Sequence, residues 1–262
     1  MTTISGKADP VVRAVTFNDV AESLIAGLRD FQAAPCYGMA LGAIYCAAGI
    51  AILLSVTSLG MSYLAYPLAA GFALLGPFVA VGFYEISRKR EAGETATFSD
   101  IIKAMTSRGE IGWMAFVTLF IFIMWMYQAR FLMALFFGLN ASFTSLTQFI
   151  AVVLTTNTGL LFLLAGNMIG AFLAVVLFSL TVVSFPLLLD RDVDCVTAMV
   201  TSVRAVVRSP VPLLGWAAMI VVLLVLAALP FFLGLIVVLP VLGHTTWHLY
   251  RRIIMPAPAA AN

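Results

Sequence analysis

Long apolar stretches alternate with short polar ones along the whole chain, and this pattern predicts an all-α, polytopic helical membrane protein. A helix needs about 20 apolar residues to cross a bilayer core about 30 Å thick. About six stretches meet this requirement. We expect them to pair into three helical hairpins within one integral membrane domain, 1–262, whose ends (1–15 and 255–262) are flexible tails. The expected spans are 37–57, 63–86, 111–127, 159–187, 211–229 and 231–250.

Three shorter segments have an apolar face and precede a hairpin each. They cover 17–33, 99–107 and 193–208, and we expect Asn18 and Ser99 to cap the first two helices. Apolar residues recur every three to four positions, as on one face of a helix. We therefore expect amphipathic helices at the inner face of the membrane. The apolar residues are Val20, Leu24, Leu28 and Phe31 in the first segment, and Val196, Met199, Val200, Val203 and Val207 in the third.

The sequence of residues 129–158 is compatible with two different structures. The stretch is apolar, but Gly138, Asn140 and several Ser and Thr residues interrupt it. An extension of the third span followed by a helix at about 143–154 in the opposite interface fits this pattern. A re-entrant element fits it too.

Composition and charge place the chain in the membrane and orient it. Hydrophobic residues make up 63% of the chain and charged residues 10%, with a mean hydropathy of +1.08, whereas soluble domains carry about 25% charged residues. The net charge of +2 is too small to indicate nucleic-acid binding. All 14 Lys and Arg residues except Arg130 fall on the face that both termini share. Because cytoplasmic loops are rich in basic residues, this asymmetry predicts an N-in, C-in orientation.

Short sequence matches suggest an internal repeat. Arg29 and Pro35 recur as Arg204 and Pro210 at a constant offset, each time between a short amphipathic segment and a span. The candidate repeats are 17–86, 98–187 and 193–252, and the second span of each contains a proline: Pro77, Pro186 and Pro240. Repeats in membrane proteins often surround a shared site or pathway.

Two histidines are the main candidates for cofactor chemistry. His244 and His248 are four residues apart, so on a helix they share a face and could bind a metal or haem together. No nearby carboxylate or thiolate completes such a site. The alternative is that both lie at the inner end of the sixth span beside Trp247 and Tyr250, in an aromatic belt. We predict no metal and no cofactor.

Other polar residues in the spans point to packing rather than catalysis. Glu85 is expected to pair with Arg88 one helical turn away. Asn167 lies between Gly166 and Gly170, a GxxxG spacing that favours close helix packing with an interhelical hydrogen bond. Motifs typical of nucleotide binding, serine hydrolysis and zinc proteolysis do not occur in the sequence, so we predict a protein that is not an enzyme.

The segment GFALLGPFVAVGFYEISRKREAG (71–93) resembles the bacterial integral membrane family called domain of unknown function 2189. The matching positions are Gly71, Phe72, Leu75, Gly76, Pro77, Phe78, Gly82, Tyr84, Glu85, Ser87, Arg88, Glu91 and Gly93, with Gly27, Asp30 and Phe31 upstream. The resemblance implies a multi-pass protein of the bacterial inner (plasma) membrane and no particular activity. It makes the junction of the second span with the inner face the candidate functional surface. Its residues are Gly76, Pro77, Tyr84, Glu85 and Arg88, to which we add Asp30 and Asn167. The alternative is a structural role, in which Gly and Pro serve close packing and a kink, and Tyr and Arg anchor the helix at the interface.

These observations lead to three hypotheses about function. The first is a non-enzymatic inner-membrane protein that acts by association, as an accessory or assembly subunit of a larger membrane complex. The second is a transporter or channel for a small or apolar solute, suggested by the repeated hairpins, the prolines and Asn167. The third is a lipid-interacting protein that shapes the membrane. The expected partners are membrane lipids and other inner-membrane proteins.

Overall fold

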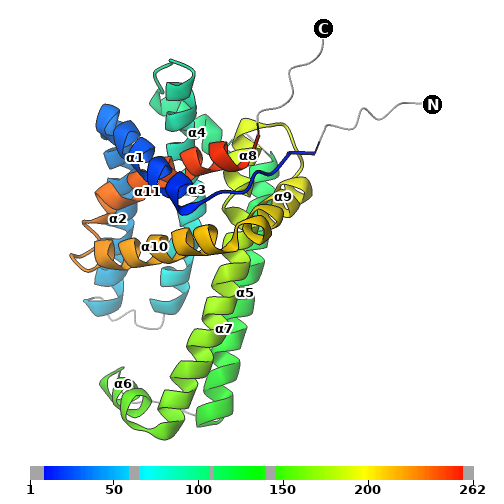
Figure 1. Ribbon diagram of the computed structural model, residues 1–262. Coiled ribbons are helices and arrows are strands. Elements are labelled where there is room, and N and C mark those ends of the chain that lie inside the picture. The colour runs from blue at the N-terminus through cyan, green and yellow to red at the C-terminus, as the bar shows by residue number, and fades with distance from the viewer. Residues whose placement is uncertain (1–8, 59–64, 107–108, 140–145, 256–262) are drawn as a thin grey trace. The chain divides into compact units, whose positions relative to one another are not determined.

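The computed structural model describes residues 9–58, 65–106, 109–139 and 146–255. Helices make up nearly all of these residues, in agreement with the all-α prediction (Figure 1). An isolated antiparallel bridge between Val12 and Ile254 is the one β-type pairing in the described part of the chain. The helices are α1 (Phe17–Ala33), α2 (Pro35–Thr57), α3 (Ala65–Glu91), α4 (Phe98–Thr106), α5 (Gly109–Phe137), α6 (Leu146–Thr155), α7 (Asn157–Thr181), α8 (Ser184–Asp190), α9 (Cys195–Arg208), α10 (Pro210–Ala228) and α11 (Leu235–Ile253).

Within the described residues, four helical segments are long and apolar enough to cross a membrane. They are Pro35–Ser55, Gly109–Phe137, Asn157–Asp190 and Pro210–Ala228. The third expected span therefore extends to Phe137, and the helix expected at 143–154 is α6. Residues 63–64 of the second expected span, and residues 143–145 of the helix expected at 143–154, lie outside the described residues.

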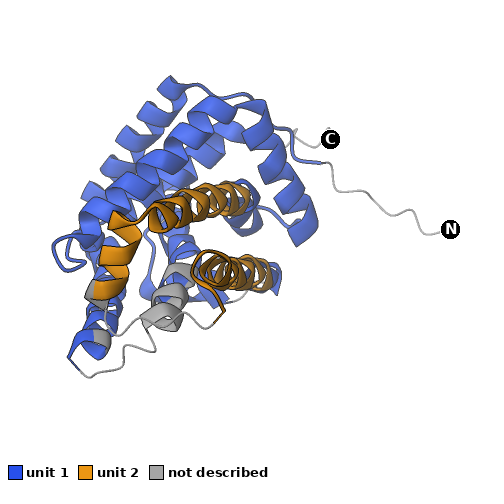
Figure 2. Cartoon of the chain, turned by 90° about the horizontal axis from the view of Figure 1, so that it is seen from below, with its two compact units in different colours: residues 1–115, 179–262 blue, residues 116–178 orange. Residues whose placement is uncertain are grey.

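The chain divides into two compact units (Figure 2). Unit 1 contains residues 1–115 and 179–262, and unit 2 contains residues 116–178. Arg130 is the one charged residue in the sequence of unit 2, so all other charges belong to unit 1. In unit 2 the aromatic ring of Phe162 on α7 packs against Phe137 of α5 and Phe149 of α6.

Helix α11 occupies the centre of unit 1, where it packs against α1, α2, α3, α8 and α10. Two glycines allow this close packing. A Cβ atom on Gly27 of α1 would lie 2.5 Å from the backbone nitrogen of Thr245, and one on Gly243 would lie 2.6 Å from the Cβ of Phe83 on α3. Any larger residue at either position would force the helices apart.

The first short helix begins at Phe17 as expected, but the capping residues of the first two short helices differ from the expected ones. Thr16, not Asn18, caps α1, because the extended backbone at Thr16 lets its hydroxyl bond to Asp19 in a capping box. Thr97 and Asp100 exchange the same pair of bonds at the start of α4, so this helix begins at Phe98 and Ser99 is not its cap. Asp194 caps α9 through the backbone N–H of Thr197.

The short helices α1 and α9 bury polar and small side chains and expose apolar ones. The buried face of α1 contains Asp19, Ser23, Gly27 and Asp30 together with Val20 of the expected apolar face, whereas Leu28 of that face is exposed. On α9 the buried residues include Ala198, Thr201, Ser202 and Ala205, whereas Val196, Val200 and Val207 are exposed. On α9 the exposed members of the apolar stripe therefore point away from the core of unit 1, whereas on α1 the stripe is divided between the core and the surface.

The segment 9–15, expected to be a flexible tail, lies along unit 1. The backbone N–H of Arg13 donates to the carbonyl of Ile253, and that of Met255 donates to Val11. The backbone N–H of Val15 donates to Ser209 Oγ between α9 and α10. The segment is held in place because its backbone bonds to the end of α11. Its polar composition gives no sign of these backbone bonds.

Candidate functional site

Buried polar side chains from three helices meet at the C-terminal end of α3. Every residue of α3 from 81 to 87 is buried, and α1 and α11 both pack against this helix. Asp30 of α1, Ser87 of α3, and His244 and His248 of α11 converge there. We call these four residues the Asp30 cluster.

Asp30 accepts hydrogen bonds from two different helices. Ser87 Oγ donates to Asp30 Oδ2 at 2.6 Å, and His248 Nε2 lies 2.8 Å from the same oxygen. The guanidinium of Arg90 lies 3.5 Å from Oδ1 and donates to the backbone carbonyl of Asp30 at 3.1 Å. Burial alone would raise the pKa of the Asp30 carboxyl, but the bonds from His248 and Ser87 outweigh it and hold the pKa below its ordinary value. Asp30 is therefore ionised at neutral pH.

His244 is fully buried behind Ser87. Its Nδ1 lies 2.8 Å from Ser87 Oγ, and its ring packs edge-on against Phe83 at a centroid distance of 5.9 Å. Because Ser87 donates its hydroxyl proton to Asp30, Nδ1–H of His244 is the donor toward the serine oxygen. The other ring nitrogen, Nε2, is buried and has no hydrogen-bond partner among the described residues.

The histidine pair has a carboxylate partner that the local sequence does not supply. Both histidines reach the same cluster, as their four-residue spacing predicts, and the carboxylate comes from Asp30, 218 positions before His248. Within the described part of the chain, no group of three or more His, Cys, Asp or Glu side chains is arranged to hold a metal ion.

A more exposed chain of ionic contacts continues from the cluster to α8. His248 Nδ1 lies 3.7 Å from Glu91, and Glu91 also pairs with Arg251 at 3.1 Å. Arg251 reaches Asp190 at 3.4 Å, and the hydroxyl of Tyr250 donates to the same carboxylate at 2.6 Å. These contacts link the ends of α3, α8 and α11.

The pair formed by Glu85 and Arg88 has the geometry that the sequence predicts. The guanidinium of Arg88 donates through two nitrogens to the two carboxylate oxygens of Glu85, both at 2.8 Å. Glu85 is buried with an exposed fraction of 3%. The neighbouring Tyr84 stacks on Trp247 of α11 at 6.5 Å. Glu85 thus has a charged partner in its own helix, while Tyr84 joins α3 to α11.

Gly76, Pro77 and Asn167 lie outside the Asp30 cluster. Gly76 faces the hydroxyl of Tyr45 on α2, and Pro77 is about three turns before Ser87 on α3. Asn167 belongs to unit 2, where its side-chain amide donates to the carbonyl of Leu163 in its own helix at 2.8 Å. The expected interhelical hydrogen bond is therefore wrong, because the carbonyl one turn earlier satisfies the amide.

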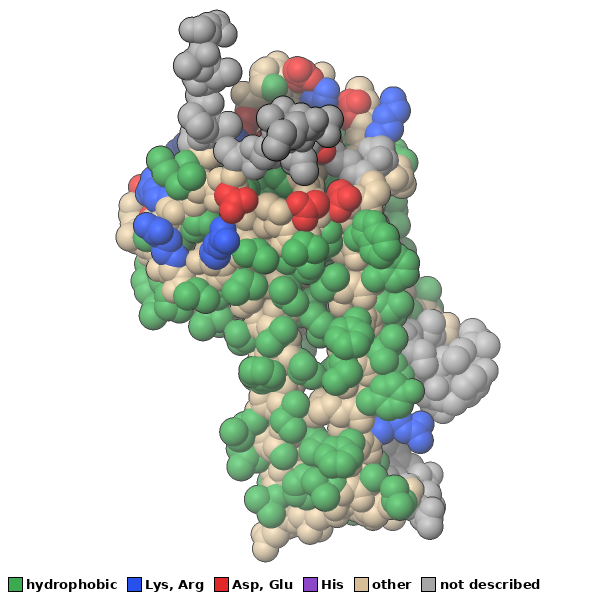
Figure 3. All heavy atoms as spheres, turned by 90° about the vertical axis from the view of Figure 1, so that its right-hand side faces the viewer, with side chains coloured by type: hydrophobic (Ala, Val, Ile, Leu, Met, Phe, Trp, Pro, Cys, Tyr) green, Lys and Arg blue, Asp and Glu red, His purple; other side chains and the backbone are tan. Residues whose placement is uncertain are grey.

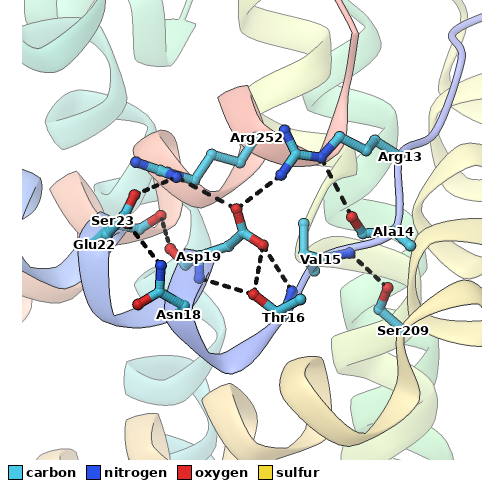
Figure 4. A network of polar contacts seen from close by, with 10 residues as sticks. All are labelled: Arg13, Ala14, Val15, Thr16, Asn18, Asp19, Glu22, Ser23, Ser209 and Arg252. Carbon is cyan, nitrogen blue, oxygen red and sulfur yellow. Dashed lines mark hydrogen bonds and ion pairs between the residues drawn. The ribbon is translucent and has the colours of Figure 1, made fainter.

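A second polar network surrounds Asp19 at the start of α1 (Figure 4). The backbone and hydroxyl of Thr16 donate to Asp19 Oδ2, both at 2.8 Å. Arg13 and Arg252 approach Oδ1 at 3.0 and 3.3 Å. Burial alone would raise the pKa of the Asp19 carboxyl. The Thr16 bonds and the two arginines lower that pKa by more than burial raises it, so the net shift is downward. This network fastens the N-terminal segment to the end of α11.

Comparison with known families concerns the region from α3 to α8. Residues 65–190 match the model of a family described as "Predicted integral membrane protein (DUF2189)". This part of the chain belongs to that family. Together with the four apolar helices, the match shows that the protein is an integral membrane protein. None of the curated proteins and none of the solved structures matches the chain.

The matched region supplies only part of the Asp30 cluster. Of its four residues, Ser87 lies inside the matched region, whereas Asp30 and both histidines lie outside. Arg90, Glu91 and Asp190, which extend the polar contacts around the cluster, also lie inside. The family segment is therefore completed in space by the first and last helices of unit 1.

Proposed function

We propose that this protein is a non-enzymatic subunit that acts by association, as an accessory or assembly factor of a larger inner-membrane complex. The observation that carries the proposal is a stripe of large exposed side chains along α5. The stripe consists of Phe120, Met124, Tyr127, Phe131 and Leu135, each with an exposed fraction between 48% and 70%. We call this surface the α5 stripe.

The spacing and chemistry of the α5 stripe fit a protein partner. Its members are three or four residues apart, so they lie on one face of the helix. Aromatic residues at the membrane–water boundary are common anchors, but Phe120 and Phe131 are separated by about 16 Å along the helix axis. The aromatic side chains thus extend well beyond one boundary layer. Exposed aromatic anchors are enriched at protein–protein interfaces.

The Asp30 cluster supports a structural role rather than catalysis. It contains the residue types of a serine-hydrolase triad, but in such a triad the histidine stands between the serine and the carboxylate. Here Ser87 stands between Asp30 and His244, and it donates its proton directly to the carboxylate. Ser87 is also completely buried. The cluster would therefore join α1, α3 and α11 without activating a nucleophile.

We further propose six crossings with both termini on the cytoplasmic side of the inner membrane. The two added spans are α3 and α11. The second half of α11 is rich in polar residues, but His244, Thr245 and Thr246 are buried inside unit 1 and would not meet lipid. The bridge between Val12 and Ile254 brings both ends of the chain together, which supports an even number of crossings.

The repeat proposal gains support from backbone geometry. Ala34, between α1 and α2, has φ −136° and ψ 55°, and Ser209, between α9 and α10, has φ −139° and ψ 62°. A proline begins the next helix in both cases. The capping pairs Thr16–Asp19 and Thr97–Asp100 recur in the same order before α1 and α4.

The test is purification of the full-length protein from its own membranes in a mild detergent. We expect a second membrane protein to co-purify in constant stoichiometry, and we expect the double substitution Phe120→Ala and Tyr127→Ala to abolish this. The matched control is Phe172→Ala, because Phe172 is an equally exposed aromatic residue of unit 2 on α7. A wild-type protein that purifies alone, or an equal loss in the control, would contradict the proposal.

A further inference from the structure

A groove lies between the N-terminal segment and α9 in unit 1. Pro10, Val11 and Val12 form one wall, and Val203, Arg204, Val207 and Arg208 form the other. The backbone bond from Val15 to Ser209 and the bonds from residues 11–13 to the end of α11 fix the first wall in place. Both walls are thus anchored to the helical body.

The groove combines exposed apolar surface with basic side chains. Val11 and Val207 are exposed by 58% and 73%, and Val200 and Val211 continue the exposed apolar surface along α9 into α10. On the face drawn in Figure 3, basic side chains lie directly beside apolar ones. This arrangement on a helix is typical of a surface that lies in the boundary layer of a membrane.

The two arginines of the groove are available to an anion. Arg208 has no acidic or hydrogen-bonding partner among the described residues, and it lies in the last turn of α9, where its charge also complements the helix dipole. Arg204 approaches one carboxylate, that of Asp9, at 3.5 Å, with both side chains largely exposed. An exposed pair at this distance contributes little, so an incoming anion can replace Asp9.

The position of the groove along the chain places it at the membrane surface. Ser209 is the single residue between α9 and α10, and α10 begins at Pro210 as a 19-residue apolar segment long enough to cross a bilayer. Arg204 and Arg208 are therefore within two helical turns of the point where the chain enters the apolar layer. A ligand there can contact the headgroup and acyl-chain regions at once.

We propose that this groove binds an anionic phospholipid. The phosphate-bearing headgroup lies against Arg204 and Arg208, and an acyl chain lies along Val11, Val207 and Val200. A zwitterionic lipid offers the same chains without the net charge, and a soluble phosphate offers the charge without the chains. The proposal is independent of the α5 stripe, because none of its residues belongs to unit 2.

The experiment measures lipid binding to the purified, delipidated full-length protein by native mass spectrometry. Phosphatidylglycerol, phosphatidylcholine and inorganic phosphate are titrated separately. Each basic residue near an anionic membrane surface strengthens binding several-fold. The double substitution Arg204→Gln and Arg208→Gln is therefore expected to weaken phosphatidylglycerol binding about 10- to 30-fold. Binding of phosphatidylcholine should change less than about 3-fold.

A matched control removes two exposed basic side chains elsewhere in unit 1, Arg29→Gln on α1 and Lys103→Gln in the last turn of α4. It should bind phosphatidylglycerol like the wild type. Substitution of Val207 by Ser should weaken the long-chain lipid but not a short-chain phosphatidylglycerol. Thermal scans establish that each variant is folded before its affinity is compared.

Several results would overturn the proposal. Equal binding of the two lipids by the wild type would remove the role of charge. An equal loss in the control would mean that net charge alone matters. Binding of inorganic phosphate as tightly as lipid would identify a soluble-anion site, and loss of a co-purifying protein in the Arg204 and Arg208 variant with unchanged lipid binding would assign the groove to a protein partner.

Discussion

Replacement of Asp30 by Asn tests whether the Asp30 cluster holds α1 against α3 and α11. The substitution keeps the shape of the side chain and removes its charge. Ser87 and His248 then bond to a neutral amide oxygen in place of a carboxylate. A hydrogen bond to a charged group contributes about 1.5–3 kcal/mol and a neutral one about 0.5–1.5 kcal/mol. Loss of charge on two such bonds should therefore destabilise the protein by about 2–3 kcal/mol.

The assay is thermal unfolding of the full-length protein in detergent at a fixed scan rate. For a chain of this size, 1 kcal/mol corresponds to a shift in Tm of about 2–4 °C, so we expect the Asp30→Asn variant to unfold about 4–12 °C below the wild type. The control is Glu94→Gln, because Glu94 is an exposed acid paired with Lys89. Exposed pairs contribute at most about 1 kcal/mol. A Tm for Asp30→Asn as high as that of the control would refute the reasoning.

The same variant predicts a pH dependence with a definite sign. The pKa of Asp30 is lowered in the folded protein, so its carboxylate stabilises the fold at any pH above the unfolded-state pKa. This contribution is lost as pH falls through the lower, folded-state pKa. The gap in Tm between wild type and Asp30→Asn should therefore narrow below about pH 4. A gap that widens in acid would contradict the assignment of the charged form.

Three further substitutions test other parts of unit 1. Gly27→Val should destabilise by about 1–3 kcal/mol through overpacking, a Tm about 2–12 °C lower, because its side chain would meet the backbone of Thr245. Gly112→Ala, with open space around it, should not lower the Tm. Glu85→Gln should destabilise by about 1–3 kcal/mol, seen in the same scan, since it removes the charge that Arg88 contacts through two bonds. Asp194→Ala should cost about 1 kcal/mol through loss of the α9 cap, measured as a Tm about 2–4 °C lower.

Local patterns predict the helices of this protein well because apolar runs and prolines act over a few residues. Pro35 and Pro210 begin α2 and α10 as expected of a residue that fits the first helical turn. Helix caps are predicted less well. Asn18 and Thr16 are both good capping residues by type, and only the backbone conformation at Thr16 decides between them.

The Asp30 cluster illustrates what sequence reasoning could not supply. Asp30, Ser87 and both histidines were visible as individual residues, but the bond between Asp30 and His248 joins positions 218 residues apart. That contact depends on how closely α1 and α11 approach, which in turn depends on Gly27 facing Thr245. No periodicity or spacing within one segment contains this information.

The orientation of the short helices escaped prediction for a related reason. A stripe of apolar residues on α1 or α9 indicates that the helix has two different faces, but not which face meets the protein. In unit 1 the polar face is inside, because Asp19, Asp30 and Ser202 find partners there. On α9 the apolar residues Val200 and Val207 are left exposed, and Val207 lines the groove beside Arg204 and Arg208.

The central claim is that the α5 stripe meets another protein, and photo-crosslinking in intact membranes tests it most directly. A photoreactive amino acid would replace Tyr127 in the stripe, and separately Phe172 on α7 as the control. We predict that position 127 forms a discrete crosslink to a different membrane protein and that position 172 crosslinks to lipid. Crosslinks to lipid alone at both positions, or to a second copy of the same chain at position 127, would contradict the claim.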